Sequence, residues 1–519
     1  MTDTDVLIAG AGPTGLALAL WLAHSGVRVR IVDKIGEPGT TSRALAVHAR
    51  TLELYERLGL ADAVVERGLA VSAINLWIKG RRVAHVDFGE IGKGASRFSY
   101  VIMFAQDEHE RLLIERLSAA GVAVESPVEL IGFDDRGDRI VARLRHGDGR
   151  EEVCDATYLA GCDGARSLVR DVLKAGFPGG TYAHVFYVAD TNASGPIMNR
   201  ELHVAIDEGD FIAAFPMKGD KRVRLIGIVE TEENDPKLSW DDVGRVVISR
   251  LGVDVERVNW FSTYRVHHRV VSDLRIGRAF LCGDAAHIHS PVGGQGMNTG
   301  IGDAFNLAWK LAAVIQSRAD DRLLDTYEPE RIAFARRLVA TTDRVFELVT
   351  SNGALAAFVR LHVVPAVAPK VARLAAVRRF MFRTVSQTAI HYRDSALSDG
   401  AGSSIRAGDR LPWIRLDDRG NDNYAPLAAL DWQAHVYGDA PQDVAALCSA
   451  RGFALHAFSW DDAMLDAGLA RNAVYFIRPD GYVGLVNTNG NVAQIERYID
   501  EWALRSCFAR VSAAPTEVT

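Results

Sequence analysis

The first part of the chain alternates short apolar runs with a glycine-rich segment and a helical pattern. Apolar residues at Val6–Ala9 predict a short strand, Leu16–His24 has the composition of a helix, and Val27–Val32 predicts a second strand. A strand, a helix and a second strand in this order are typical of a parallel sheet covered by helices. We therefore expect the chain to begin with a βαβ unit.

The middle of the chain has a different pattern, in which short strands are separated by polar turns. The runs are His203–Ile206, Phe211–Phe215 and Val223–Val229. Turns rich in Asp, Glu, Gly and Lys between such runs favour an antiparallel sheet. Alternation along these strands would leave one face to pack and the other free to line a pocket.

The last third of the chain returns to mixed patterns. A strand at Ala279–Cys282 precedes a glycine-rich loop and a helix, and the pattern from Arg331 to about Tyr392 is mainly helical. The Ser- and Gly-rich stretch 395–404 predicts a linker. Beyond it, strands at Ala434–Tyr437, Ala473–Ile477 and Tyr482–Val486 and the segment Val492–Trp502 predict a small α/β domain.

These patterns divide the chain into four parts. A discontinuous domain built on the βαβ unit would take 1–75, 97–180 and 270–345, an antiparallel-sheet domain 76–96 and 181–269, a helical segment 346–398, and the small α/β domain 405–510.

Charge and composition exclude several classes of partner. The 519 residues carry a net charge of −7 and no basic stripe, so a nucleic-acid partner is not expected. The most apolar long stretch, Ala354–Ala376, is interrupted by four basic or histidine side chains and is too polar for a membrane span. The N-terminus lacks the charged and apolar regions of a signal peptide.

The five cysteines are scattered and form no CxxC pair. This spacing argues against both a disulfide framework and a bound metal. We expect reduced thiols, no metal and a cytoplasmic location.

The segment after the first strand predicts a dinucleotide site. In this segment Gly10 would permit the tight turn, Gly12 would let the backbone approach the pyrophosphate, and Gly15 would let the helix pack closely on the strand. Asp33 follows the second strand, near the spacing expected for an acid that binds a ribose hydroxyl. The cofactor contacts expected in the loop are Gly10, Gly12, Pro13, Thr14 and Gly15.

Two further motifs narrow the class of dinucleotide-binding protein. One is Cys162-Asp163-Gly164-Ala165-Arg166, and the other is Gly283-Asp284 followed by a second glycine loop, 291–298. With these three motifs in this order, residues 5–395 resemble the single-component FAD-dependent aromatic hydroxylases of the para-hydroxybenzoate hydroxylase and phenol hydroxylase type. The resemblance implies an α/β fold with a Rossmann-like FAD-binding domain and an antiparallel-sheet substrate domain.

The resemblance also implies roles for single residues. Asp284 would hold the ribityl chain of FAD, Arg43 would approach the pyrophosphate, and Gln106 would contact FAD. Asp163 and Arg166 would support both FAD and NAD(P)H.

The second glycine loop precedes a predicted helix whose N-terminus would point at the flavin. A helix N-terminus favours the negative charge that reduced flavin carries there. Backbone N–H groups could donate to the ring, and Pro291 would stand beside its reacting edge. The residues expected to contribute are Pro291, Gly294, Gly296, Met297 and Asn298.

By the same resemblance, NAD(P)H reduces FAD and O2 then adds to give a C4a-hydroperoxide, which hydroxylates a small aromatic compound. A phenolic substrate would benefit from a base; His48 is our candidate, and the absence of any protein base is the alternative. The predicted substrate pocket is lined by His203, Phe211, Phe215 and Pro291.

Residues 405–510 resemble the thioredoxin-like C-terminal domain of the phenol hydroxylase branch, with Arg478–Val483 matching its turn. Without a CxxC pair we expect no dithiol chemistry, and a role in packing or in a homodimer. An epoxidase or a polyketide-tailoring oxygenase on the same fold stays open, as does a flavin-binding protein without turnover. The substrate and the choice between NADH and NADPH are left undetermined.

Overall fold

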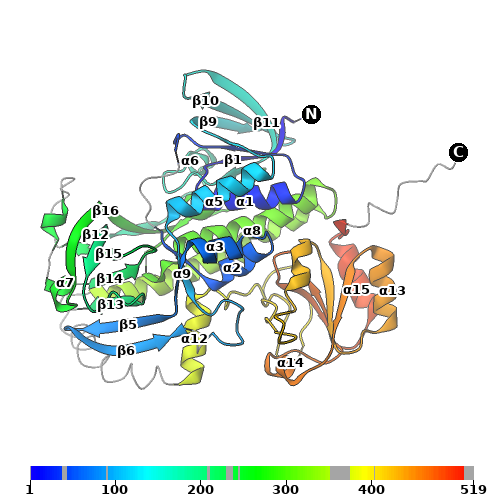
Figure 1. The fold of residues 1–519 in the computed structure, drawn as a ribbon. Coiled ribbons are helices and arrows are strands. Elements are labelled where there is room, and N and C mark those ends of the chain that lie inside the picture. The colour runs from blue at the N-terminus through cyan, green and yellow to red at the C-terminus, as the bar shows by residue number, and fades with distance from the viewer. Residues whose placement is uncertain are drawn as a thin grey trace.

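The computed structural model describes residues 2–37, 44–88, 92–206, 211–229, 238–243, 246–290, 292–350, 374–402 and 404–507. It is a mixed α/β structure with two large sheets and a smaller C-terminal sheet (Figure 1). Within the described part of the chain, no helix combines the length and the apolar character needed to cross a bilayer.

The first sheet is built on the predicted βαβ unit. Strand β1 (Thr4–Ala9) lies parallel to β2 (Val29–Val32) on one side and to β11 (Glu151–Gly161) on the other. Helix α1 (Pro13–His24) connects β1 to β2, and its side chains from Leu16 to Leu22 are fully buried. The strand order is β17-β18-β11-β1-β2-β8. The remaining strands are β8 (Val124–Glu125), β9 (Val128–Asp135), β10 (Ile140–His146), β17 (Arg275–Ile276) and β18 (Ala279–Leu281).

The second sheet has the order β19-β16-β12-β15-β14-β13-β5-β6. Its neighbouring strands are antiparallel, as predicted, except that β13 runs parallel to β5. The strands are β5 (Ala73–Ile78), β6 (Arg81–Asp87), β12 (Gly179–Ser194), β13 (Leu202–Ile206), β14 (Phe211–Pro216), β15 (Arg222–Val229), β16 (Asp254–Val270) and β19 (His287–Ile288).

Helices join the two sheets. Helix α8 (Gly296–Ile315) packs against α1 and α2 in the centre of the view (Figure 1). The other helices here are α2 (Ala49–Glu56), α3 (Ala61–Arg67), α5 (Gln106–Ala119), α6 (Leu168–Leu173), α7 (Val246–Arg250), α9 (Tyr327–Thr350) and α12 (Ala375–Val385). A small sheet contains β3 (Ala46–Val47), β7 (Val101–Met103) and β4 (Leu69–Val71). Short 3-10 turns lie at Trp240–Asp242, Gly283–Ala285, Val292–Gly294, Asp321–Thr326 and Ala425–Ala429.

The C-terminal part is an α/β unit with strand order β21-β20-β22-β23. One face of its sheet shares an apolar cluster with the rest of the protein, where Trp432 meets Trp309 of α8 edge to face. Its elements are β20 (Gln433–Tyr437), α13 (Gln442–Arg451), β21 (Ala454–Phe458), α14 (Asp462–Asp466), β22 (Val474–Ile477), β23 (Val483–Asn487) and α15 (Val492–Glu501).

The predicted linker is tied to both neighbouring parts. Leu397 is fully buried, Asp399 bridges to Leu485 of β23, and the buried hydroxyl of Ser395 donates to Glu330 at 2.7 Å. Its Ser-rich composition therefore reflects buried hydrogen bonds as well as turns.

Candidate cofactor site

The three sequence motifs meet at one edge of the first sheet. Ala9 of β1 pairs with Gly161 of β11, and Gly161 pairs with Leu281 of β18. Because these strands are parallel, the residues that follow them lie together beyond their carboxyl ends. The glycine loop, the Asp163 motif and the Gly283-Asp284 motif are thus neighbours, although they are distant in the chain.

The glycine loop leaves space where an anion would approach. Gly10 has φ 103°, and a side chain there would overlap the carbonyl group of Cys162. A side chain at Gly15 would overlap the carbonyl of Gly10, so this residue lets α1 pack on the loop. At Gly12, by contrast, a Cβ would meet nothing within 4 Å. The N-terminus of α1 therefore faces an open space, which fits a pyrophosphate.

A cavity of about 630 Å³ lies beside this loop. The residues that line it include six that the sequence singled out: Gly10, Gly12, Asp33, Gln106, Asp163 and Arg166.

Two of these acidic residues also shape the backbone. Asp33 accepts hydrogen bonds from the N–H groups of Ala11 and Ile35, both at 2.7 Å. Asp163 accepts from the N–H of Val169 at 3.1 Å through one oxygen, while its other oxygen is buried with no partner among the described residues. That unpartnered acceptor is what a cofactor hydroxyl would satisfy.

Gln106 and Thr14 have partners inside the protein. Gln106 accepts from the N–H of Ala44 at 3.2 Å and donates to Glu110 at 2.9 Å. The hydroxyl of Thr14 lies against Gly283 and Gly300, where a Cβ on either glycine would crowd it. Thr14 therefore packs α1 against the Gly283 turn and α8.

Asp284 is exposed at the open side of the turn formed by Gly283–Ala285. The turn is bound to α8, because the backbone N–H of Gly283 donates to Asp303 of that helix at 3.0 Å. Burial would raise the pKa of Asp303, but His287 and Arg331 outweigh burial and hold the pKa at about 2. Asp303 is therefore a buried carboxylate at neutral pH.

The second glycine loop ends where α8 begins. Gly294 has φ 63°, and α8 starts at Gly296, so Met297 and Asn298 lie in its first turn. Backbone N–H groups in a first helical turn have no acceptor within the helix. The side-chain amide of Asn298 makes four hydrogen bonds. It accepts from the backbone N–H of His48 and from the Thr51 hydroxyl, and it donates to the carbonyls of Ala46 and Gly294.

His48 lies beneath this loop and is 2% exposed. Its Nε2 is 2.9 Å from the Gly293 carbonyl and 3.2 Å from that of Gly294, so Nε2 carries the proton and donates. Burial lowers its pKa to about 4, and the carbonyl contacts offset this only in part. The geometry favours a structural role, in which neutral His48 holds the glycine loop, and not the role of a base that we predicted.

The predicted substrate-pocket residues do not share one face of the second sheet. Phe215 pairs with Arg224, which donates to the carbonyl of Ala44 beside the glycine loops at 3.2 Å, and Phe211 lies on the same face. His203 pairs with Ala214, on the opposite face. There its ring accepts from Trp77 at 3.0 Å and contacts Asn199 at 2.8 Å.

Placing His203 with the phenylalanines was therefore wrong. Side chains alternate between the two faces of a strand, and the pairing register that decides the face could not be derived from the sequence. Arg43 and Pro291 lie outside the described residues.

Sequence reasoning missed the buried polar residues of α8 and α9. Asp303, Asn306 and Lys310 recur at helical spacing inside an otherwise apolar stretch, and all three are buried with hydrogen-bond partners on α9. A row of polar residues on a helix that is apolar elsewhere was the available signal.

Comparison with known proteins agrees with this geometry. Residues 3–342 match the FAD binding domain family model. A 6-methylpretetramide 4-monooxygenase from Streptomyces rimosus is 40% identical over 409 residues, which is 77% of this chain and 72% of that protein. A pentachlorophenol 4-monooxygenase from Sphingobium chlorophenolicum is 30% identical, covering 80% of this chain and 77% of its own.

The same arrangement occurs in solved structures. The anhydrotetracycline hydroxylase OxyS from Streptomyces rimosus superimposes with a TM-score of 0.76 at 27% identity, over 96% of this chain and 99% of that one. The chain belongs to the FAD binding domain family and, within it, to the single-component FAD-dependent aromatic monooxygenases.

Proposed function

We propose that this enzyme hydroxylates an electron-rich phenol of several rings, taking electrons from NAD(P)H and one oxygen atom from O2. The observation that carries the proposal is the meeting of three motifs at one edge of the first sheet, where two of them line the cavity of about 630 Å³. When bound, FAD would supply electron transfer and the activation of oxygen. The residues of the chain bind, orient and shield it.

The cavity and the two helix N-termini give the chain's own residues distinct tasks. The N-terminus of α1, with Gly12 at its open side, would bind the pyrophosphate. Asp33, Asp163 and Asp284 would accept from sugar and ribityl hydroxyls. Gly296, Met297 and Asn298 at the start of α8 would donate backbone hydrogen bonds to the ring, where the helix dipole also favours negative charge.

The second sheet would cover the substrate. Its face beside the glycine loops carries Phe211, Phe215 and Ile226, together with the buried ion pair of Arg224 and Asp190 at 2.6 Å. An apolar cover would exclude water from the reacting centre. The ion pair would give one polar edge that could orient a substrate hydroxyl or carbonyl group.

The names of the relatives support the substrate class. Two of the three similar proteins are named for 6-methylpretetramide and anhydrotetracycline, and the third for pentachlorophenol. A multi-ring phenol is therefore the first class to test, with single-ring phenols second.

The test is to purify the protein with FAD and follow NADH and NADPH oxidation in the presence of single-ring and multi-ring phenols, with product masses measured in parallel. We expect faster oxidation with a multi-ring phenol and a product that has gained one oxygen atom as a hydroxyl group. Hydrogen peroxide without a hydroxylated product would identify a compound that stimulates the reduction of FAD but binds in the wrong position to receive the oxygen atom. An added oxygen without a new hydroxyl would indicate an epoxidase, and no stimulation by any phenol would overturn the proposal.

A further inference from the structure

A turn of the C-terminal unit reaches into the core behind the cofactor site. This turn, Arg478–Gly481, follows β22. Arg478 is 0% exposed and donates to both oxygens of Glu330 of α9, at 2.8 and 2.9 Å. It also donates to both oxygens of Asp480, at 3.0 and 2.7 Å. Such bidentate contacts fix the orientation of the guanidinium relative to the carboxylate as well as the distance between them.

The same carboxylates hold the later half of α8. Glu330 accepts from Lys310 at 2.8 Å and from Asn306 at 2.7 Å, while Asp480 accepts from the indole N–H of Trp309 at 3.1 Å. Side chains on successive turns of α8 are thus bound to the turn, directly or through Glu330.

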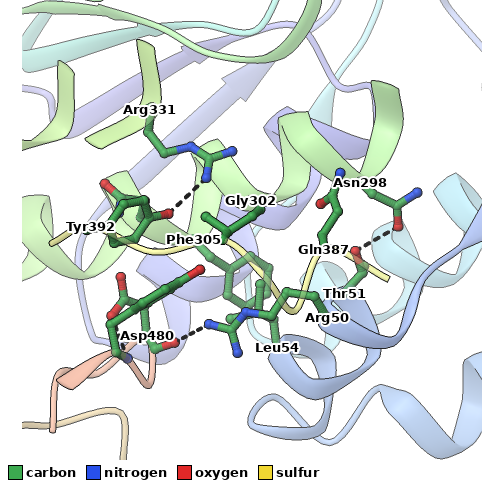
Figure 2. Close-up of a pocket in the computed structure, with 13 residues that line it drawn as sticks. Arg50, Thr51, Leu54, Asn298, Gly302, Phe305, Arg331, Gln387, Tyr392 and Asp480 are labelled. Atoms are coloured by element: carbon green, nitrogen blue, oxygen red, sulfur yellow. Dashed lines mark hydrogen bonds between the residues drawn. The ribbon is translucent and has the colours of Figure 1, made fainter. Parts of the chain in front are cut away.

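The next residue of α9 holds the earlier half of α8. Arg331 donates to Asp303 at 2.6 Å and to the carbonyl of Thr299 at 3.0 Å. Its third contact, to the hydroxyl of Tyr392 at 2.9 Å, is visible in Figure 2. The ring of Tyr392 in turn lies 4.3 Å, centroid to centroid, from that of Tyr482, directly after the turn.

A second path leads from the turn to the first residues of α8. Arg50 of α2 donates to the carbonyl of Asp480 at 2.6 Å, and its neighbour Thr51 donates to Asn298 at 2.8 Å. Both contacts border a small cavity of about 20 Å³ between α2, α8 and the turn (Figure 2).

Three basic and three acidic side chains pair with one another between α8, α9 and the turn, and all six are buried. Lys310, Arg331 and Arg478 face Asp303, Glu330 and Asp480. Burial opposes the ionisation of Glu330, but Arg478 and Lys310 hold its pKa well below the usual value. An apolar contact could join the two units as tightly, so the cost of burying these charges points to a role in alignment here.

We propose that Arg478 is a positioning residue for the flavin: through Glu330 and Asp480 it sets the place of α8, and with it the helix N-terminus at the ring. The C-terminal unit is on this view a part of the flavin site. The inference rests on the proposed function, which puts the flavin at the start of α8.

The test compares Arg478→Met with Arg478→Lys and with Leu469→Ala. Leu469 is fully buried in the C-terminal core away from α8, so its variant destabilises the unit without touching the ion cluster. FAD affinity, the midpoint potential of bound FAD and its visible spectrum are measured for each. We expect Arg478→Met to weaken FAD binding about tenfold and to shift the potential. Arg478→Lys should recover part of both, and Leu469→Ala should change affinity less than about twofold.

A folded Arg478→Met protein with the affinity, potential and spectrum of the wild type would overturn the inference. If Arg478→Met does not fold, Trp309→Phe removes the indole N–H that reaches Asp480 and keeps an aromatic ring against Trp432. We then expect FAD binding to weaken at least about twofold, and an unchanged affinity and potential would overturn the inference equally. Failure of the wild-type protein to bind FAD would instead refute the proposed function.

Discussion

The carboxylate of Asp303 joins the backbone of Gly283 to the guanidinium of Arg331, at 3.0 and 2.6 Å. One side chain of α8 therefore holds the turn that carries Asp284 while α9 holds that side chain. The turn and the start of α8, which would contact different parts of the same cofactor, are thereby fixed to each other.

Asp303→Asn should destabilise the protein and weaken FAD binding together, because it leaves Arg331 buried without its ionic partner. The expected loss in unfolding free energy at pH 7 is about 3 kcal/mol, measured by urea unfolding of the apoprotein. The folded-state pKa of Asp303 is lowered from 3.8 to about 2, so its contribution is complete above pH 4 and is lost as pH falls towards 2. The gap between wild type and variant should narrow over that range, and a gap that stays constant would contradict this role.

Gly12→Ala should separate cofactor binding from folding. A Cβ at Gly12 meets no protein atom within 4 Å, and the backbone there is extended. We expect the stability of the apoprotein to change by no more than about 1 kcal/mol, whereas FAD affinity, measured by fluorescence titration, falls about tenfold or more.

Gly15→Ala is the matched control for Gly12→Ala, since its Cβ would overlap the carbonyl of Gly10. That variant should lose stability even without FAD. Equal FAD affinity in Gly12→Ala and wild type would show that the pyrophosphate binds elsewhere.

His48→Gln tests whether this residue acts as a base. Because its pKa is lowered to about 4 by burial, His48 stays neutral across the working range and should give the pH profile of kcat/KM no limb near 6.5. The glutamine can still donate to the loop carbonyls, so we expect activity within about fivefold of wild type and a profile of the same shape. A limb near pH 6.5 in the wild-type profile that is absent from the variant would show that His48 acts as a base.

The same substitution should change the acid stability. Unfolded His48 takes up a proton below pH 6.5 and the folded residue only near pH 4, so wild type loses stability as pH falls through that interval. Relative to His48→Gln the loss should reach about 3 kcal/mol at pH 4, measured by urea unfolding.

Phe215→Ala and His203→Ala test which face of the second sheet meets the substrate. Phe215 lies on the face beside the glycine loops and His203 on the opposite one. We expect Phe215→Ala to raise KM and the fraction of NAD(P)H lost to peroxide several-fold. His203→Ala should lower stability through the loss of its contact with Trp77, with KM unchanged. The reverse pattern would place the substrate on the far face.

Local patterns were enough for the elements that carry the cofactor motifs. The strand predicted at Val27–Val32 is observed at Val29–Val32, and the helix predicted after the second glycine loop begins at Gly296. These features depend on a few adjacent residues with strong conformational preferences. The face of His203 and the partners of Asp303 depend on strand register and on contacts between distant segments. The periodicity of residues within one segment does not predict such contacts between distant segments.

The interleaving of segments limits how this protein can be divided. The two large sheets draw their strands alternately from the first 290 residues, so no single cut separates them. The C-terminal unit is one continuous piece and could be exchanged as a block between related enzymes. Its buried Arg478 would then demand a matching acid at the Glu330 position of the recipient. Successful chimaeras should therefore be those in which this pair is inherited together, whatever the similarity of the surfaces around it.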